Sequence, residues 1–103
     1  MPIYLHVGGL MAAGFDPSGK FLLTVSHAGR GVFAVGSWER VARDNALAYP
    51  EHGCAVGIGP IEGLSIPVTE MNYETEELSL HSPDGMFRLN YDSGTITVTD
   101  MRA

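Results

Sequence analysis

The chain has 103 residues, of which 45% are hydrophobic and 17% are charged, and its formal net charge is −6 at pH 7. This composition excludes a disordered chain and fits a single domain over residues 1–103. The six basic residues are scattered, so they do not form the cationic patch that nucleic acids and anionic membranes require. We expect a protein partner instead, and a basic surface on that partner would complement the negative charge.

Cysteine usage and hydropathy limit where the protein acts. Cys54 is the single cysteine, so a disulfide framework within the chain is excluded. The first residues lack the basic and long apolar regions of a signal peptide, and no window reaches the roughly 20 apolar residues of a membrane helix. We therefore expect a cytoplasmic protein.

The first third of the chain predicts four strands. Residues 3–7 and 10–13 are short β-forming segments separated by two glycines. Residues 16–19 read Asp-Pro-Ser-Gly, which is typical of a tight turn because proline fixes φ and glycine accepts positive φ. Residues 21–25 and 32–35 follow as two strands joined by a glycine-containing connection, which together predict a hairpin.

The segment from Ser37 to Tyr49 allows two interpretations. Ser37 is a suitable N-cap, and an apolar stripe at helical spacing predicts one short helix over about 37–48. The alternative continues the preceding strand from Val32 through Val41. Pro50 ends either element.

The second half of the chain predicts short strands separated by turns. They are residues 54–58, 64–68, 78–81, 87–91 and 95–99. Pro67 makes the second of these an edge strand or an extended loop. Residues 72–77 are polar and acidic, and they predict a solvated connection. The last two strands form a second hairpin, introduced by Ser-Pro-Asp-Gly at residues 82–85.

Two stretches of the chain, residues 15–38 and 81–100, follow the same pattern. When Pro17 is aligned with Pro83, the turn glycines and the following phenylalanines also coincide. This proline-glycine turn, strand, glycine turn and strand resembles the hairpin of a β-propeller blade of the WD40 or TolB-like kind. The copies lie 66 residues apart, not the roughly 40 to 50 of a propeller repeat, and Gly-His and Trp-Asp signatures are lacking. The resemblance therefore implies blade-like hairpins in a small β domain, not a complete propeller, and it carries no function. The two matching stretches, 15–38 and 81–100, are interpreted either as an internal duplication of the hairpin or as similar turns that arose independently.

His52 and Cys54 are weak candidates for catalysis. On a strand, residues two apart share a face, so the pair could bind a metal or act as base and nucleophile. The alternative is a surface histidine beside a small buried thiol. The histidine spacings match no metalloprotease motif, and there is no C-x-x-C, so we expect neither a metal nor a cofactor.

The candidate protein-binding residues are an acidic group and the single tryptophan: Glu70, Glu74, Glu76, Glu77 and Trp38. Exposed glutamates could meet a basic partner, or they could simply form a solvated face. Trp38 could be an interface residue, or it could anchor the core.

The sequence thus predicts a mainly β protein: a small antiparallel sheet, sandwich or partial barrel built from hairpins, with α+β as the alternative. Its predicted core is Leu5, Phe21, Leu23, Val25, Val32, Val35, Trp38, Leu80, Phe87, Leu89, Ile96 and Val98. Sparse charge and hairpin edges that need covering favour a homo-oligomer such as a homodimer.

The favoured function is a non-catalytic protein-interaction module of immunity or inhibitor type, or an accessory subunit. The alternative is a small enzyme or ligand-binding protein with a site around His52 and Cys54 at a subunit interface.

Overall fold

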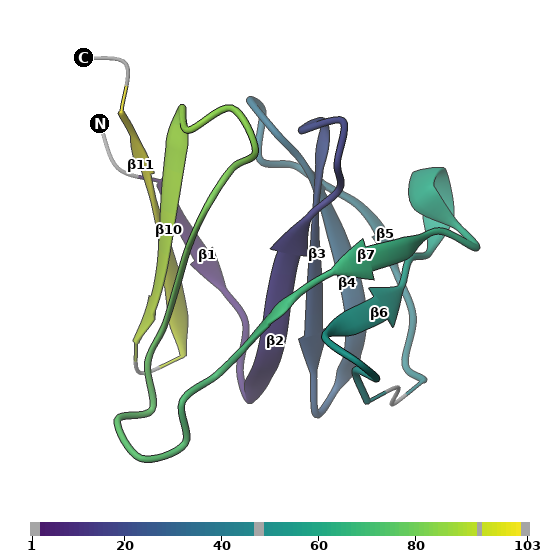
Figure 1. The fold of residues 1–103 in the computed structure, drawn as a ribbon, viewed down its shortest axis with the longest axis horizontal. Coiled ribbons are helices and arrows are strands. Elements are labelled where there is room, and N and C mark those ends of the chain that lie inside the picture. Colours follow the sequence, from purple (N-terminus) through teal and green to yellow (C-terminus); the bar gives the residue numbers. More distant parts are fainter. Residues whose placement is uncertain (1–2, 47–48, 93, 102–103) are drawn as a thin grey trace.

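A computed structural model describes residues 3–46, 49–92 and 94–101, and these residues form a mainly antiparallel β structure in three layers (Figure 1). The terminal sheet has the order β1 (Ile3–His6), β11 (Thr95–Asp100), β10 (Phe87–Asp92) and β9 (Leu78–His81). The central sheet has the order β5 (Arg40–Arg43), β4 (Gly29–Ala34), β3 (Phe21–Ser26), β2 (Leu10–Phe15) and β8 (Thr69–Glu70). The third layer is a hairpin of β6 (Cys54–Val56) and β7 (Ser65–Pro67).

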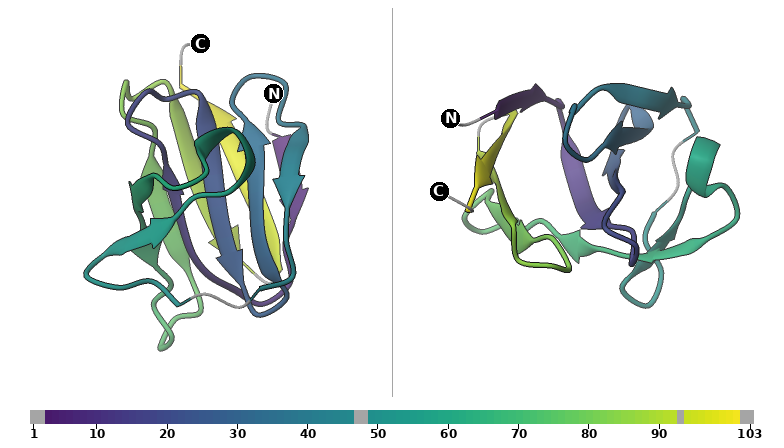
Figure 2. Two further views of the ribbon diagram at one scale, coloured as in Figure 1. Left: turned by 90° about the vertical axis from the view of Figure 1, so that its right-hand side faces the viewer. Right: turned by 90° about the horizontal axis from the view of Figure 1, so that it is seen from above.

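The central sheet is covered on both faces, and the views in Figure 2 show it between its neighbours. One apolar cluster joins it to the terminal sheet, and a second joins its other face to the β6–β7 hairpin. All six residues of β2 are buried, because this strand lies inside the sheet between β3 and β8. Nine of the twelve predicted core residues are buried, and Phe21, Val35 and Leu80 are partly buried.

The predicted hairpins β3–β4 and β10–β11 are both present, but each lies in the interior of its sheet. The terminal sheet receives its fourth strand from the other end of the chain, where Ile3 pairs with Val98. The expectation that the hairpins leave edges for a partner to cover is therefore wrong, because β1, β2, β5 and β9 cover them.

The two proline-glycine turns have matching hydrogen bonds. The N–H of Phe21 donates to Oδ1 of Asp16 at 2.8 Å, and the N–H of Phe87 donates to Oγ of Ser82 at 3.0 Å. The backbone N–H groups of Asp16 and Ser82 each donate to the carbonyl of that same phenylalanine at 2.9 Å. A buried side-chain oxygen at the first turn position thus fixes the start of the next strand in both turns.

Aspartate and serine occupy opposite positions in the two turns: the first turn has Asp16 and Ser18, and the second has Ser82 and Asp84. The hydroxyl of Ser18 donates to the carboxylate of Asp16, whereas the hydroxyl of Ser82 donates to Oδ1 of Asp84 at 2.7 Å. Each turn therefore contains one hydrogen bond between a serine and an aspartate side chain, with the residue order reversed. The duplication of the hairpin itself stays a prediction.

The corresponding strands of the two hairpins, β3 and β10, direct their buried side chains toward the same end of the stack of three layers. Leu23 and Val25 of β3 point to the β6–β7 hairpin, whereas Leu89 and Tyr91 of β10 point to the central sheet. The terminal sheet consequently packs on the face of the central sheet that lies opposite the β6–β7 hairpin. The equivalent faces of the two hairpins do not pack against each other.

The predicted helix over 37–48 is wrong within the described residues, and so is the α+β alternative. Residues 40–43 form β5, which pairs with β4, and Trp38 has a φ of 58°, outside the right-handed helical region. Residues 47 and 48 lie outside the described part. A strand running continuously through Val41 is also wrong, because the chain turns after Ala34.

Helical structure in the described residues is limited to the 3₁₀ turn η1 (Gly59–Ile61). No helix in this part of the chain is long and apolar enough to cross a membrane.

Asp16→Asn is expected to lower the free energy of unfolding at neutral pH by about 1–2 kcal/mol, because it weakens a buried hydrogen-bonded turn. Burial by itself raises the pKa of Asp16, but hydrogen bonds from Ser18, Phe21 and Lys20 together outweigh burial and hold the pKa below its ordinary value of 3.8. The carboxylate thus stabilises the fold above about pH 4, and this contribution is lost as pH falls through the lowered pKa.

Chemical denaturation across acid and neutral pH checks this prediction. The difference between wild type and Asp16→Asn should shrink at low pH, while the exposed Glu62→Gln control should behave like wild type throughout. A difference that is constant with pH would contradict the proposed role of the charged carboxylate.

Candidate functional site

The acidic segment is an ordered loop between β8 and β9. The backbone N–H of Asn72 donates to the carbonyl of Glu77 at 2.9 Å, and the N–H of Glu76 donates to the carbonyl of Asn72 at 2.7 Å. The side chain of Asn72 also accepts a hydrogen bond from the N–H of Glu74 at 2.9 Å. These bonds close the turn, while the side chains of Glu74, Glu76 and Glu77 stay exposed. Glu70, on β8, is exposed beside them.

A hollow of about 560 Å³ lies beside this acidic loop, on the outer face of the terminal sheet. We call it the loop hollow, and its polar lining is Asn72, Thr75, Glu77, Ser79, Arg88, Asn90 and Asp92. These side chains come from the loop, β9 and β10. The arrangement places amide and hydroxyl groups, two carboxylates and the guanidinium group of Arg88 around one concave surface. The two carboxylates outnumber the one cation, so the surface favours a hydrogen-bond donor of positive charge.

His52 and Cys54 do not share a strand face. His52 (φ 54°) and Gly53 (φ 75°) occupy the two central positions of a tight turn. Backbone hydrogen bonds between Glu51 and Cys54 close this turn, and Cys54 begins β6. The sequence reasoning assumed an extended segment here, whereas the structure has a turn. Within the described ranges, no group of three histidine, cysteine or acidic residues is placed to hold a metal.

Trp38 lies in the core between the terminal and central sheets. Trp38 is only 6% exposed, and its ring packs edge to face against the ring of Phe87, with the ring centroids 5.2 Å apart. Trp38 is therefore not available at the surface described here, and it anchors the two sheets to each other.

A second polar pocket, which the sequence reasoning missed, lies beside β5. It has a volume of about 200 Å³, and its lining includes His6, Thr24, Ser26, Gly29, Arg30, Gly31, Arg40, Arg43 and Asp44. We call it the arginine pocket. Three of the six basic residues of this acidic chain line it.

An irregularity in strand pairing gives the arginine pocket two of its charges. Arg40 pairs with Phe33, and Arg43 pairs with Gly31. The two arginines are three residues apart on β5, whereas their partners are only two residues apart on β4. The extra residue forms a β-bulge, so Arg40 and Arg43 share one face of the sheet despite their odd spacing. No sequence pattern announces this bulge, and His6 comes from a distant part of the chain.

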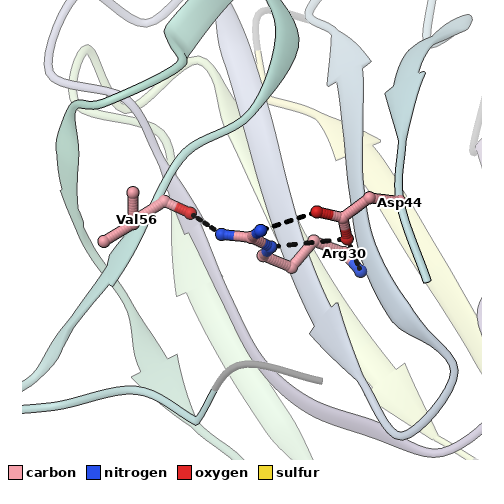
Figure 3. Close-up of polar contacts among 3 residues, drawn as sticks. All are labelled: Arg30, Asp44 and Val56. Atoms are coloured by element: carbon pink, nitrogen blue, oxygen red, sulfur yellow. Dashed lines mark hydrogen bonds and ion pairs between the residues drawn. The ribbon is translucent and has the colours of Figure 1, made fainter. Parts of the chain in front are cut away.

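Arg30 and Asp44 form an ion pair at the side of the pocket (Figure 3). Nη2 of Arg30 lies 2.6 Å from Oδ2 of Asp44, and Nη1 donates to the carbonyl of Val56 at 3.0 Å. The hydrogen bond from Arg30 is the main reason why the pKa of Asp44 lies below its ordinary value. This pair neutralises Asp44 and connects β4 to the end of β5 and to the β6–β7 hairpin.

No protein-family model matches this chain, and no curated protein or solved structure shows significant similarity to it.

Asp44→Asn is expected to loosen β5, because it removes the charge that holds Arg30. For this partly exposed pair we expect a loss of about 0.5–1 kcal/mol in the stability of β5 at neutral pH. Hydrogen exchange should show faster amide exchange in residues 40–43, with residues 87–92 unchanged.

Glu39→Gln, which removes an exposed carboxylate next to β5, is the matched control and should leave the exchange of residues 40–43 unaltered. Equal acceleration in both variants would contradict a specific role for Asp44.

Proposed function

We propose that the protein is a non-catalytic protein-interaction module of inhibitor or immunity type, or an accessory subunit, and that it binds a basic partner. The observation that carries this proposal is the ordered acidic loop beside the loop hollow. The partner surface would consist of Glu70, Glu74, Glu76 and Glu77 together with the hollow.

The geometry of the loop supports such a role in two ways. Its backbone is already closed by the hydrogen bonds of Asn72, so binding would cost less conformational entropy than ordering a free loop. Tyr73, which is 62% exposed on the same loop, adds an aromatic surface of the kind that is enriched in protein interfaces.

Charge supports the same assignment. A net charge of −6 steers positively charged partners toward the protein at low salt. A lysine or arginine side chain entering the hollow would meet the oxygens of Glu77 and Asn90, and the carboxylate of Glu77 would offset the like charge of Arg88 in the same lining. Charge-assisted hydrogen bonds of this kind are stronger than neutral ones.

Replacing Glu74, Glu76 and Glu77 together by glutamine should weaken binding of a lysine-rich peptide. We expect about a tenfold rise in Kd at low salt and a smaller rise near physiological salt, because exposed charges are screened. Fluorescence anisotropy with a labelled hexalysine probe measures the Kd at each of the two salt concentrations.

The control replaces Glu39, Glu51 and Glu62 by glutamine, which changes the net charge equally at exposed positions away from the loop. If both triple variants lose the same affinity, the peptide senses net charge and the loop is not the binding surface.

We also propose that the protein self-associates as a homo-oligomer. Val56 and Leu64 are 55% and 51% exposed, and they lie beside each other where Gly57 donates to the carbonyl of Leu64. Apolar side chains exposed together at one end of a hairpin are stabilised when a second copy covers them.

Light scattering on a size-exclusion column should give a mass above that of one chain, unchanged by salt. Val56→Ser should shift the equilibrium toward the monomer, whereas Val41→Ser, at another exposed valine, should not. A monomeric wild type would contradict self-association.

A cytoplasmic location stays a prediction. The hypothesis of a small enzyme or ligand-binding protein around His52 and Cys54 also stays a prediction, and the turn geometry gives it no support.

A further inference from the structure

We propose that the arginine pocket is a binding site for a phosphate group, either free or carried as a monoester, and that it is separate from the acidic loop. The starting observation is a local reversal of charge. The chain carries twice as many acidic as basic residues, yet half of its basic residues line this one pocket.

The two guanidinium groups of Arg40 and Arg43 are the charges available to a ligand. Asp44 is paired with Arg30, and neither Arg40 nor Arg43 forms an ion pair with a carboxylate in the described residues. The guanidinium carbon of Arg40 lies 5.1 Å from the ring centroid of Phe33, which is itself buried. This cation–π contact restrains Arg40 before any ligand arrives.

The floor of the pocket is open because it contains glycine. A Cβ atom on Gly31 would lie 3.1 Å from Oγ1 of Thr24 and 3.8 Å from Nε of Arg40. A side chain here would therefore occupy the space between the hydroxyl and the guanidinium group. Thr24 and Ser26 hydrogen-bond to the carbonyls of Gly31 and Gly29, so their hydroxyls are held at this floor.

The charge and shape of the pocket favour a phosphate monoester over a carboxylate. Two guanidinium groups carry two positive charges, which match a phosphate monoester dianion, whereas a carboxylate would neutralise one of them. His6, from the end of β1, adds an imidazole N–H donor to the lining, next to the arginine donors of β5. A tetrahedral anion can accept hydrogen bonds from donors on several sides, which a planar carboxylate does less well.

The source of the phosphate is open to a direct comparison. A phosphorylated small molecule, a phosphorylated side chain and free phosphate all share the same anionic group. The pocket has a volume of about 200 Å³, so it accepts the phosphate and a few further atoms, while the rest of the ligand stays outside.

An amide NMR titration of the full chain tests the proposal, with phenyl phosphate, inorganic phosphate and benzoate as probes. We expect phenyl phosphate to shift the amide signals of Gly29, Gly31 and Arg43 saturably, and benzoate to bind at least fivefold more weakly. Arg40→Gln and Arg43→Gln should each weaken phenyl phosphate binding by about five- to tenfold. Inorganic phosphate binding as tightly as phenyl phosphate would identify free phosphate as the source; weaker binding would identify an ester.

Two further variants separate this site from general effects. Lys20→Gln makes the same charge change at an exposed position outside both the arginine pocket and the loop hollow, and it should alter affinity by less than about twofold in moderate salt. Gly31→Ala keeps every charge but fills the floor, and it should abolish the saturable shifts while circular dichroism shows the fold retained.

Three results would overturn the proposal. They are the absence of saturable shifts with both phosphate probes, benzoate binding as tight as phenyl phosphate, and equal losses in Arg40→Gln and Lys20→Gln. Because these probes do not involve the acidic loop, failure here would leave the proposed protein-binding function unaffected.

Discussion

The apolar layer between the terminal and central sheets is the interaction on which the rest of this structure depends. It buries side chains from both sheets, and the edge-to-face contact of Trp38 with Phe87 lies within it. Trp38 lies two residues before the start of β5, so its position in this layer also sets where β5 begins. The hydrophobic contact and the placement of the arginines on β5 are consequently linked through two residues of backbone. A chain of this size has little other apolar surface that could hold the terminal and central sheets together.

Local chemistry made most of the fold predictable. Proline-glycine turns and alternating apolar residues located β3, β4, β10 and β11, because each of these signals acts within a few residues. The helix predicted after Ser37 is wrong, because the apolar spacing of this segment suits a helix whereas its pairing with β4 determines its conformation. Tertiary contacts override propensity in such short segments. The pairing of β1 with β11 joins opposite ends of the chain, and no local pattern encodes it.

The candidate sites differ in how far sequence could reach them. The acidic loop is contiguous, so its residues can be recognised together from the sequence alone. The arginine pocket combines His6, Thr24 and Arg43 from separate strands, and it depends on a bulge that changes which residues share a face. A site made of neighbouring residues can be predicted from sequence. A site that depends on strand register and a bulge becomes visible only in the folded structure.

The pairing of Ile3 with Val98 also has a consequence for folding during synthesis. The strands β2 to β5 are successive neighbours and can pair as soon as they leave the ribosome, whereas β1 must wait for β11. Until then the back of the central sheet, with Leu22 and Phe33, remains uncovered. An incompletely folded chain therefore exposes an apolar surface until β10 and β11 are in place, and this raises its tendency to aggregate before folding is complete.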